Sequence, residues 1–270
     1  VFMERNVLSA NGLFGGRDFT QGLYYKYNTD GLWLGASGYS QTKVGKGNTK
    51  GVGGNARIAY APINEAGKLL HVGLTYSVDQ FALGGTNPGY STPTAGYSTA
   101  YSKSGNSFNV LSFGAAGNAK ANTATLEAMG IIGPVFLQGE YGTAKYKDDS
   151  AAPIASQTVN AYSVTASWFV TGESRTYKAG DAAYGSAKIN SVDGAVELGV
   201  RYDNIKNKDS GAKVSAVTFG ANYYCNQNVR FMLDYSLAKV DDFAAGTGGL
   251  VAGATSASPK ALMARAQISF

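Results

Sequence analysis

The chain has 270 residues, a formal charge of +5 and a mean hydropathy of −0.13. It contains 36 glycines and 18 tyrosines but only 6 prolines, so the glycine excess is not that of a collagen or a disordered chain. No run of about 18 apolar residues occurs, which excludes transmembrane helices but not a transmembrane β-barrel, whose strands alternate apolar and polar side chains. The opening residues V-F-M-E-R-N are not a signal peptide, so an exported protein would have lost its signal.

The rare reactive side chains give little support for catalysis. The one cysteine, Cys225, cannot form an internal disulfide, and we expect a partly buried or turn thiol. The one histidine, His71, has no cysteine or second histidine beside it, so we expect no metal site and no cofactor. A Ser-His-Asp triad stays a minor alternative because no G-x-S-x-G motif is present. Lysine and arginine are scattered without a basic helix, so we expect no nucleic-acid partner.

Alternating apolar and polar residues predict strands that come in pairs. Short turns join four of these pairs, with the sequences N-T-D-G, A-P-I-N-E-A-G, I-I-G-P and C-N-Q-N. The expected pairs are, in chain order, 22–27 with 32–36, 55–60 with 70–78, 123–128 with 135–141, 162–170 with 196–202, and 217–223 with 229–237.

The last ten residues, 261–270, predict a final strand with one apolar face and one charged face. Its apolar face ends on Phe270, and an aromatic residue at that place suits the membrane interface of a β-barrel. The strands are about ten residues long, which is the length that crosses a membrane at a tilt. Aromatic residues near the strand ends suggest interfacial girdles, formed by Tyr27, Tyr141, Trp168, Tyr202, Tyr223 and Tyr235. We therefore expect an all-β transmembrane antiparallel β-barrel rather than a soluble sandwich.

Longer segments rich in Gly, Ser, Asn, Thr and Lys separate the pairs, at 40–53, 79–121, 147–158, 204–212 and 242–259. Short periplasmic turns and long extracellular loops are typical of outer-membrane barrels. The connection from Thr171 to Asp193 breaks this pattern, because it is long and falls on the periplasmic side. We expect it to hold an unrecognised strand pair or to be a functional turn.

These elements give about eleven strands, an odd number that does not close a barrel in the usual way. We interpret residues 1–270 as a single barrel domain that lacks N-terminal strands, with residues 1–18 in a loop. The alternative is twelve strands, with 2–14 or 107–116 as the extra one. The segment 107–116 alternates weakly, and a loop folded into the lumen would also explain it.

Several longer motifs stand out along the chain, namely F-M-E-R-N at 2–6, G-R-D at 16–18, G-P-V-F-L-Q-G-E-Y at 133–141, W-F-V-T-G-E-S-R-T-Y at 168–177, G-A-V-E-L-G-V-R-Y-D at 194–203 and F-G-A-N-Y-Y-C-N-Q-N-V-R-F-M-L-D-Y at 219–235. Together they cover most of the chain, and in this order they resemble motifs of the phosphate-selective porins of the O and P type.

The resemblance implies a sixteen-stranded homotrimeric porin of the Gram-negative outer membrane, in contact with lipid and lipopolysaccharide. It implies that loops and one inward-folded periplasmic turn narrow the pore, and that the solutes are small anions such as phosphate. The best-known members carry a ladder of closely spaced arginines, and this chain has no R-x-R run.

Charged side chains on the polar face of the strands must point into the lumen, because facing lipid costs several kcal/mol at mid-bilayer. The pore-lining candidates are Lys26, Arg57, Glu127, Glu140, Glu197, Arg201, Arg230, Asp234 and Arg265. They form an anion path if the bases are free, or a rigid wall if acids and bases pair. Unpaired loop bases are the better candidates for the constriction that sets selectivity, and these are Lys43, Lys46, Lys50, Lys103, Lys120, Arg175 and Lys178.

The sequence therefore predicts a non-enzymatic outer-membrane channel for passive diffusion of small anions. A non-conducting structural or adhesive barrel is the alternative, and an outer-membrane hydrolase that uses His71 is a weaker one.

Overall fold

The computed structural model describes residues 1–10, 21–29, 31–40, 51–82, 94–98, 107–113, 118–149, 153–189, 191–247 and 249–269. Within these residues, no helix has the length and apolar character needed to cross a membrane.

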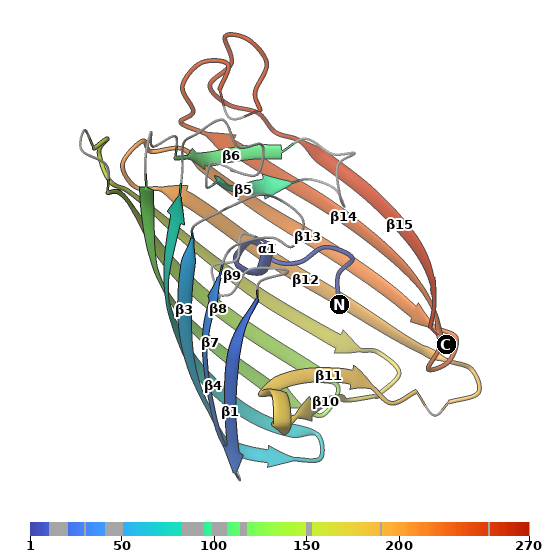
Figure 1. Ribbon diagram of the computed structural model, residues 1–270. Coiled ribbons are helices and arrows are strands. Elements are labelled where there is room, and N and C mark those ends of the chain that lie inside the picture. Colours follow the sequence, from blue (N-terminus) through green and yellow to red (C-terminus); the bar gives the residue numbers. More distant parts are fainter. Residues whose placement is uncertain are drawn as a thin grey trace.

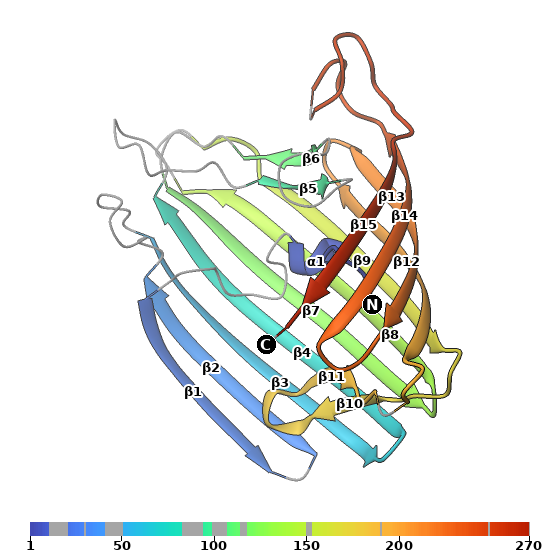
Figure 2. The same cartoon turned by 90° about the vertical axis from the view of Figure 1, so that its right-hand side faces the viewer.

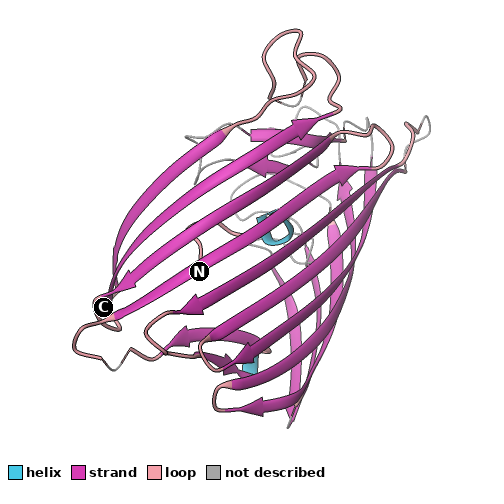
Figure 3. Cartoon of the chain, turned by 180° about the vertical axis from the view of Figure 1, so that it is seen from behind, coloured by secondary structure: helices cyan, strands magenta, loops and turns pink. Residues whose placement is uncertain are grey.

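Eleven strands form one sheet in which each strand pairs antiparallel with its neighbours (Figure 1). In sheet order they are β1 (Gln21–Thr29), β2 (Leu32–Ser40), β3 (Val52–Glu65), β4 (Lys68–Ala82), β7 (Asn118–Ile132), β8 (Val135–Asp148), β9 (Gln157–Phe169), β12 (Ala195–Asn207), β13 (Lys213–Tyr224), β14 (Val229–Asp241) and β15 (Lys260–Ile268). The sheet is tilted and strongly curved, with β1 and β15 at its edges (Figures 2 and 3). The predicted barrel wall and its eleven strands are confirmed, whereas further strands before residue 1 stay a prediction.

The twelve-strand alternative is wrong for the part of the chain that the structure describes. The segment 107–116 contributes β6 (Ser107–Ser112), which pairs with β5 (Thr94–Ser98) in a separate two-stranded sheet. The segment 2–14 contributes the short helix α1 (Val7–Ala10). Both lie in the space that the curved sheet encloses (Figure 1), where Leu8 and Phe113 are fully buried in one apolar cluster.

The two faces of the sheet differ in polarity in the way the alternation predicts. On β14, Phe231, Leu233 and Tyr235 are exposed on the convex face, whereas Met232 and Asp234 are buried on the concave face. In the middle of the described strands, all charged side chains are on the concave face. On β15, Leu262 and Ile268 are exposed on the convex face, and Phe270 lies outside the described residues.

Connections at one end of the sheet are short, and we call this the short-turn end. Only Ala66 and Gly67 separate β3 from β4, so the expected turn over 61–67 is wrong in length. β3 continues through Pro62 because its pairing register shifts between Tyr60 and Ile63, and a bulge accommodates a residue that cannot donate to the ladder. Cys225 is a free, partly buried thiol in the turn between β13 and β14.

The connection between β9 and β12 is the long one at the short-turn end. It contains β10 (Arg175–Lys178), the 3₁₀ turn η1 (Ala179–Asp181) and β11 (Ala183–Ala187). β10 and β11 pair antiparallel, which confirms the expectation of an unrecognised strand pair. We call residues 171–189 the inner hairpin, because this segment folds over the concave face of the sheet (Figure 2).

Candidate functional site

The tip of the inner hairpin is held to the sheet through its backbone carbonyl groups. Gly180 O accepts hydrogen bonds from Lys26 Nζ at 2.8 Å and from Trp33 Nε1 at 3.1 Å. Ala182 O accepts a hydrogen bond from Arg57 Nη2 at 2.7 Å. Both Lys26 and Arg57 therefore point to the concave side, as predicted, and both contact the hairpin.

Glu127 on β7 joins the sheet to the middle of the inner hairpin. Its Oε1 accepts hydrogen bonds from Arg57 Nε at 3.0 Å and Nη2 at 2.5 Å, and it lies 3.3 Å from His71 Nε2. The other ring nitrogen of the buried His71 lies 2.8 Å from the Tyr177 hydroxyl on β10. Burial raises the pKa of Tyr177, so its hydroxyl stays protonated and can donate to Nδ1.

The base of the inner hairpin is held by a buried ion pair between Arg175 and Glu197. Arg175 is 7% exposed and Glu197 is fully buried. The guanidinium carbon also lies 5.4 Å from the ring centre of Phe136, 5.6 Å from that of Tyr184 and 5.9 Å from that of Phe169. The expectation that Arg175 is an unpaired loop base is therefore wrong, because β10 places it against the wall.

The segment 1–10 crosses the enclosed space and is held by wall carboxylates. Asp234 accepts a hydrogen bond from Met3 N at 2.7 Å, and Asp203 accepts one from Val7 N at 3.2 Å. Asp203 is also paired with Arg201 at 2.6 Å. Arg201 and Asp234 thus lie on the concave face, as predicted, but both are occupied in holding this segment.

A cavity of about 330 Å³ lies between the segment 1–10 and the wall. Glu140 and Arg201 contribute to its lining from the sheet, and Arg5 contributes from the segment. Arg5 is exposed and has no ion pair or hydrogen bond within the described part of the chain. The alternation pattern contains no signal for Arg5, and the motif F-M-E-R-N at 2–6 includes it without indicating a role.

Two further predicted wall residues lie toward the edge strand β15. Arg230 donates to Gln267 Oε1 from Nε at 3.1 Å and from Nη2 at 2.8 Å. Arg265 lies half-buried on the concave face of β15. Glu140, deeper in the wall, accepts a hydrogen bond from Gln138 Nε2 at 2.6 Å. All pore-lining candidates therefore face inward, and most of them have a polar partner.

The predicted constriction bases differ in how the structure places them. Lys43, Lys46, Lys50 and Lys103 lie outside the described residues. Lys120 is not an unpaired loop base, because β7 extends to Asn118 and places Lys120 2.6 Å from Asp149. Lys178 ends β10 and is exposed, and the described residues offer it no ion pair. Lys178 is therefore exposed and without an ion pair among the described residues, as expected for a constriction base.

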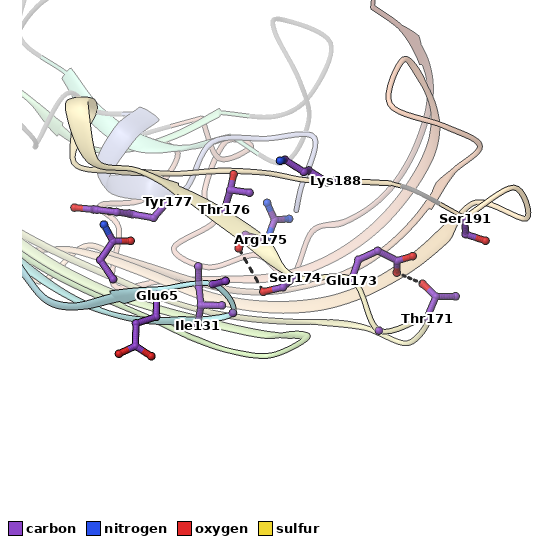
Figure 4. Close-up of a pocket in the computed structure, with 14 residues that line it drawn as sticks. Glu65, Ile131, Thr171, Glu173, Ser174, Arg175, Thr176, Tyr177, Lys188 and Ser191 are labelled. Atoms are coloured by element: carbon purple, nitrogen blue, oxygen red, sulfur yellow. Dashed lines mark hydrogen bonds between the residues drawn. The ribbon is translucent and has the colours of Figure 1, made fainter.

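A second cavity, of about 650 Å³, opens at the short-turn end between the inner hairpin and the turns beside it (Figure 4). Glu65 and Glu173 line it together with Lys188. Glu173 accepts a hydrogen bond from the Thr171 hydroxyl. Because carboxylates outnumber free cations here, the cavity does not favour an anion.

Glu4 is expected to give the concave side of the sheet a charge that depends on pH. Burial raises the pKa of Glu4, against the opposing effect of Arg265 and Arg201. Because its pKa is raised, Glu4 takes up a proton at a higher pH than an ordinary carboxyl group does, and the concave side then loses a negative charge. We expect the anion-to-cation permeability ratio to be higher at a pH just above the ordinary carboxyl range than at alkaline pH. Reversal potentials in a salt gradient measure it, and Glu4→Gln should show the raised ratio at both pH values. Equal pH responses of the two proteins would contradict this assignment.

Comparison with known proteins agrees with this geometry. The family described as phosphate-selective porin O and P matches residues 1–270. Porin O of Pseudomonas aeruginosa is 31% identical over 213 residues, which cover 69% of this chain and 48% of that protein. The chain thus spans about half the length of this curated relative. A solved structure, outer-membrane expressed OmpT of Vibrio cholerae, matches with a TM-score of 0.51 and 13% identity over 92% of this chain and 64% of that one, which supports the fold. The chain is an outer-membrane β-barrel protein and belongs to the phosphate-selective porin O and P family.

Proposed function

We propose that the protein forms a water-filled channel through which small anions, phosphate among them, diffuse passively across the outer membrane. The observation that carries this proposal is the polarity of the curved sheet. In the middle of the strands, its concave face holds the charged side chains, and its convex face holds exposed leucine, valine, phenylalanine and tyrosine. Such a wall is stable only with lipid outside and water inside. Membership in the family supports the same function.

We base a preference for anions on the charges that stay exposed on the concave side. The acids Glu127, Glu197 and Asp203 are each in an ion pair with an arginine. Glu140 and Asp234 have no such pair among the described residues but are buried, and Glu4 is partly buried. Arg5 and Lys178 are exposed and have no such partner within the described residues. Free cations in a narrow aqueous path raise the local anion concentration, and a guanidinium group can replace part of an anion's hydration. We propose Arg5 and Lys178 as the selectivity residues.

Planar-bilayer recording tests the function directly. The purified full-length protein should give steady conductance steps and a reversal potential of the sign that anion selectivity requires. Phosphate added to a chloride solution should lower the chloride current if the two anions share the path. A silent membrane would support the non-conducting structural or adhesive alternative. Steady steps with cation selectivity would keep the channel and refute the role of the free bases.

We further propose that the protein catalyses no reaction and works as a homotrimer in contact with lipopolysaccharide. His71 is fully buried and contacts Glu127 and Tyr177, so the geometry does not favour the hydrolase alternative. Support for the trimer comes from the family resemblance. Crosslinking of the protein in native membranes tests it, and a product of monomer mass alone would refute it.

A further inference from the structure

Lysines gather on the convex face of the sheet at the end opposite the short turns. Every second residue of a strand lies on the convex face. At this end of the sheet, most strands from β7 to β15 have a lysine at such a position. The described members are Lys120 on β7, Lys145 and Lys147 on β8, Lys206 on β12, Lys213 on β13, Lys239 on β14 and Lys260 on β15. We call these seven residues the lysine rim.

The lysine rim stands directly above the apolar band of the same strands. Along the convex face of β8, Val135, Leu137 and Tyr141 are exposed and are followed by Lys145 and Lys147. The arginines of the strands do not join this rim, because all of them point to the concave face. A long ammonium side chain beside an apolar band is suited to lie along lipid and reach its headgroup.

Two pairs within the rim place like charges directly opposite each other. Lys120 is paired in register with Lys147, and Lys206 is paired with Lys213. Like charges directly opposite on one face destabilise a sheet. Asp149 and Asp241 offset part of this repulsion, with Lys120 Nζ 2.6 Å from Asp149 and Lys213 Nζ 3.8 Å from Asp241.

The other lysine of each pair is left without such compensation. Within the described residues, Lys147 and Lys206 are exposed and have no ion pair. An anion bound between the opposed ammonium groups would remove the repulsion and make charge-assisted hydrogen bonds to both.

Among the described strand residues, the rim lies on β7 to β15 and does not continue onto β3 and β4. At the same level of β3 and β4, the convex-face positions are Val52 and Gln80. A general preference of strand ends for lysine would not produce this difference. The difference instead indicates a surface fitted to a particular neighbour along β7 to β15.

We propose that the lysine rim binds the phosphate groups of a phosphorylated glycolipid in the outer leaflet of the membrane. The proposal rests on the proposed function for one point only, that the convex face lies in lipid with the long loops outside the cell. That orientation places the rim at the headgroups of the outer leaflet. Clusters of basic side chains at such a level bind anionic lipid headgroups. The neighbour is therefore lipid, and the pore itself takes no part in the binding.

The test compares the full-length protein with three variants in detergent, with bisphosphorylated lipid A as the probe and the same lipid after enzymatic removal of its phosphates as the reference. The rim variant is Lys147→Gln with Lys206→Gln. The charge-retaining variant is Lys147→Arg with Lys206→Arg. The matched control is Lys68→Gln with Lys188→Gln, which removes two exposed lysines from the short-turn end. Native mass spectrometry measures bound lipid, and melting with and without lipid gives a second readout.

We expect the rim variant to bind lipid A at least about tenfold more weakly than the unchanged protein, because two charge-assisted contacts are lost. The charge-retaining variant and the control should bind normally, and the dephosphorylated lipid should bind weakly to all four. Lipid A should raise the melting temperature of the unchanged protein but not that of the rim variant. Conductance of the rim variant should be unchanged, so a silent channel would refute the proposed function and not the rim.

Full binding by the rim variant would overturn the proposal, as would equal binding of the dephosphorylated lipid by the unchanged protein. If the rim variant does not fold, the comparison of the two lipids on the unchanged and charge-retaining proteins decides.

Discussion

Replacing Glu197 with alanine is expected to lower the free energy of unfolding by about 3–5 kcal/mol. The change removes the carboxylate that Arg175 is paired with, while Arg175 stays buried among three aromatic rings. It also leaves the Tyr224 hydroxyl without its acceptor, which lies 2.8 Å away in the native protein. Unfolding by urea in lipid vesicles measures the loss. Single-channel noise should increase as well, because the base of the inner hairpin is no longer fixed.

Two control variants make this test specific. Asp181→Ala removes a second, exposed ion pair of the inner hairpin, in which the side chains of Lys26 and Asp181 are 37% and 65% exposed, and it should cost less than about 1 kcal/mol. The double change of Arg175 and Glu197 to methionine should recover most of the loss, since neither side chain of the pair then leaves a buried charge without its partner. A Glu197→Ala protein as stable as the Asp181→Ala protein would show that the buried pair does not hold the hairpin.

Reversing the charges of Arg5 and Lys178, which have no ion pair among the described residues, should have the largest effect on transport. With Arg5→Glu and Lys178→Glu together, we expect the anion-to-cation permeability ratio to fall by at least about threefold, because each change replaces an attraction for anions by a repulsion across a few ångströms of water. The reversal potential in a salt gradient measures the ratio.

The control for this pair is Lys68→Glu with Lys188→Glu, the same charge change at the short-turn end. It should alter the ratio much less, because water and salt screen charges at an open mouth. Equal shifts in the two proteins would mean that net charge, and not the position of Arg5 and Lys178, sets the selectivity.

The sequence was sufficient to predict the wall of the barrel because a simple repeat determines it. The alternation of Val196, Leu198, Val200 and Tyr202 with Glu197 and Arg201 gave both the strand β12 and the inward direction of its charges. The ends of the strands were less accurate. β7 extends beyond its predicted start to Asn118, since convex-face residues beyond the apolar band are polar and no longer alternate.

The contents of the lumen could not be predicted in the same way. The segment 1–10 is held by Asp203 and Asp234, which are about two hundred residues away in the chain. The inner hairpin is short, and R-T-Y-K has no apolar face, so its strands gave no periodic signal. The pairing of Arg175 with Glu197 also depends on that fold, which explains why Arg175 was wrongly expected to be free and why Arg5 was missed.

The central claim is that the convex face of the sheet lies in lipid and the concave face encloses water. Spin labels placed one at a time at residues 229–237 of β14, after Cys225→Ser, test it most directly in lipid vesicles. Collisions with oxygen, which concentrates in lipid, should peak at the odd-numbered residues such as Phe231, Leu233 and Tyr235, and collisions with a water-soluble nickel complex should be low there. High nickel accessibility at those residues, or no alternation at all, would contradict the account.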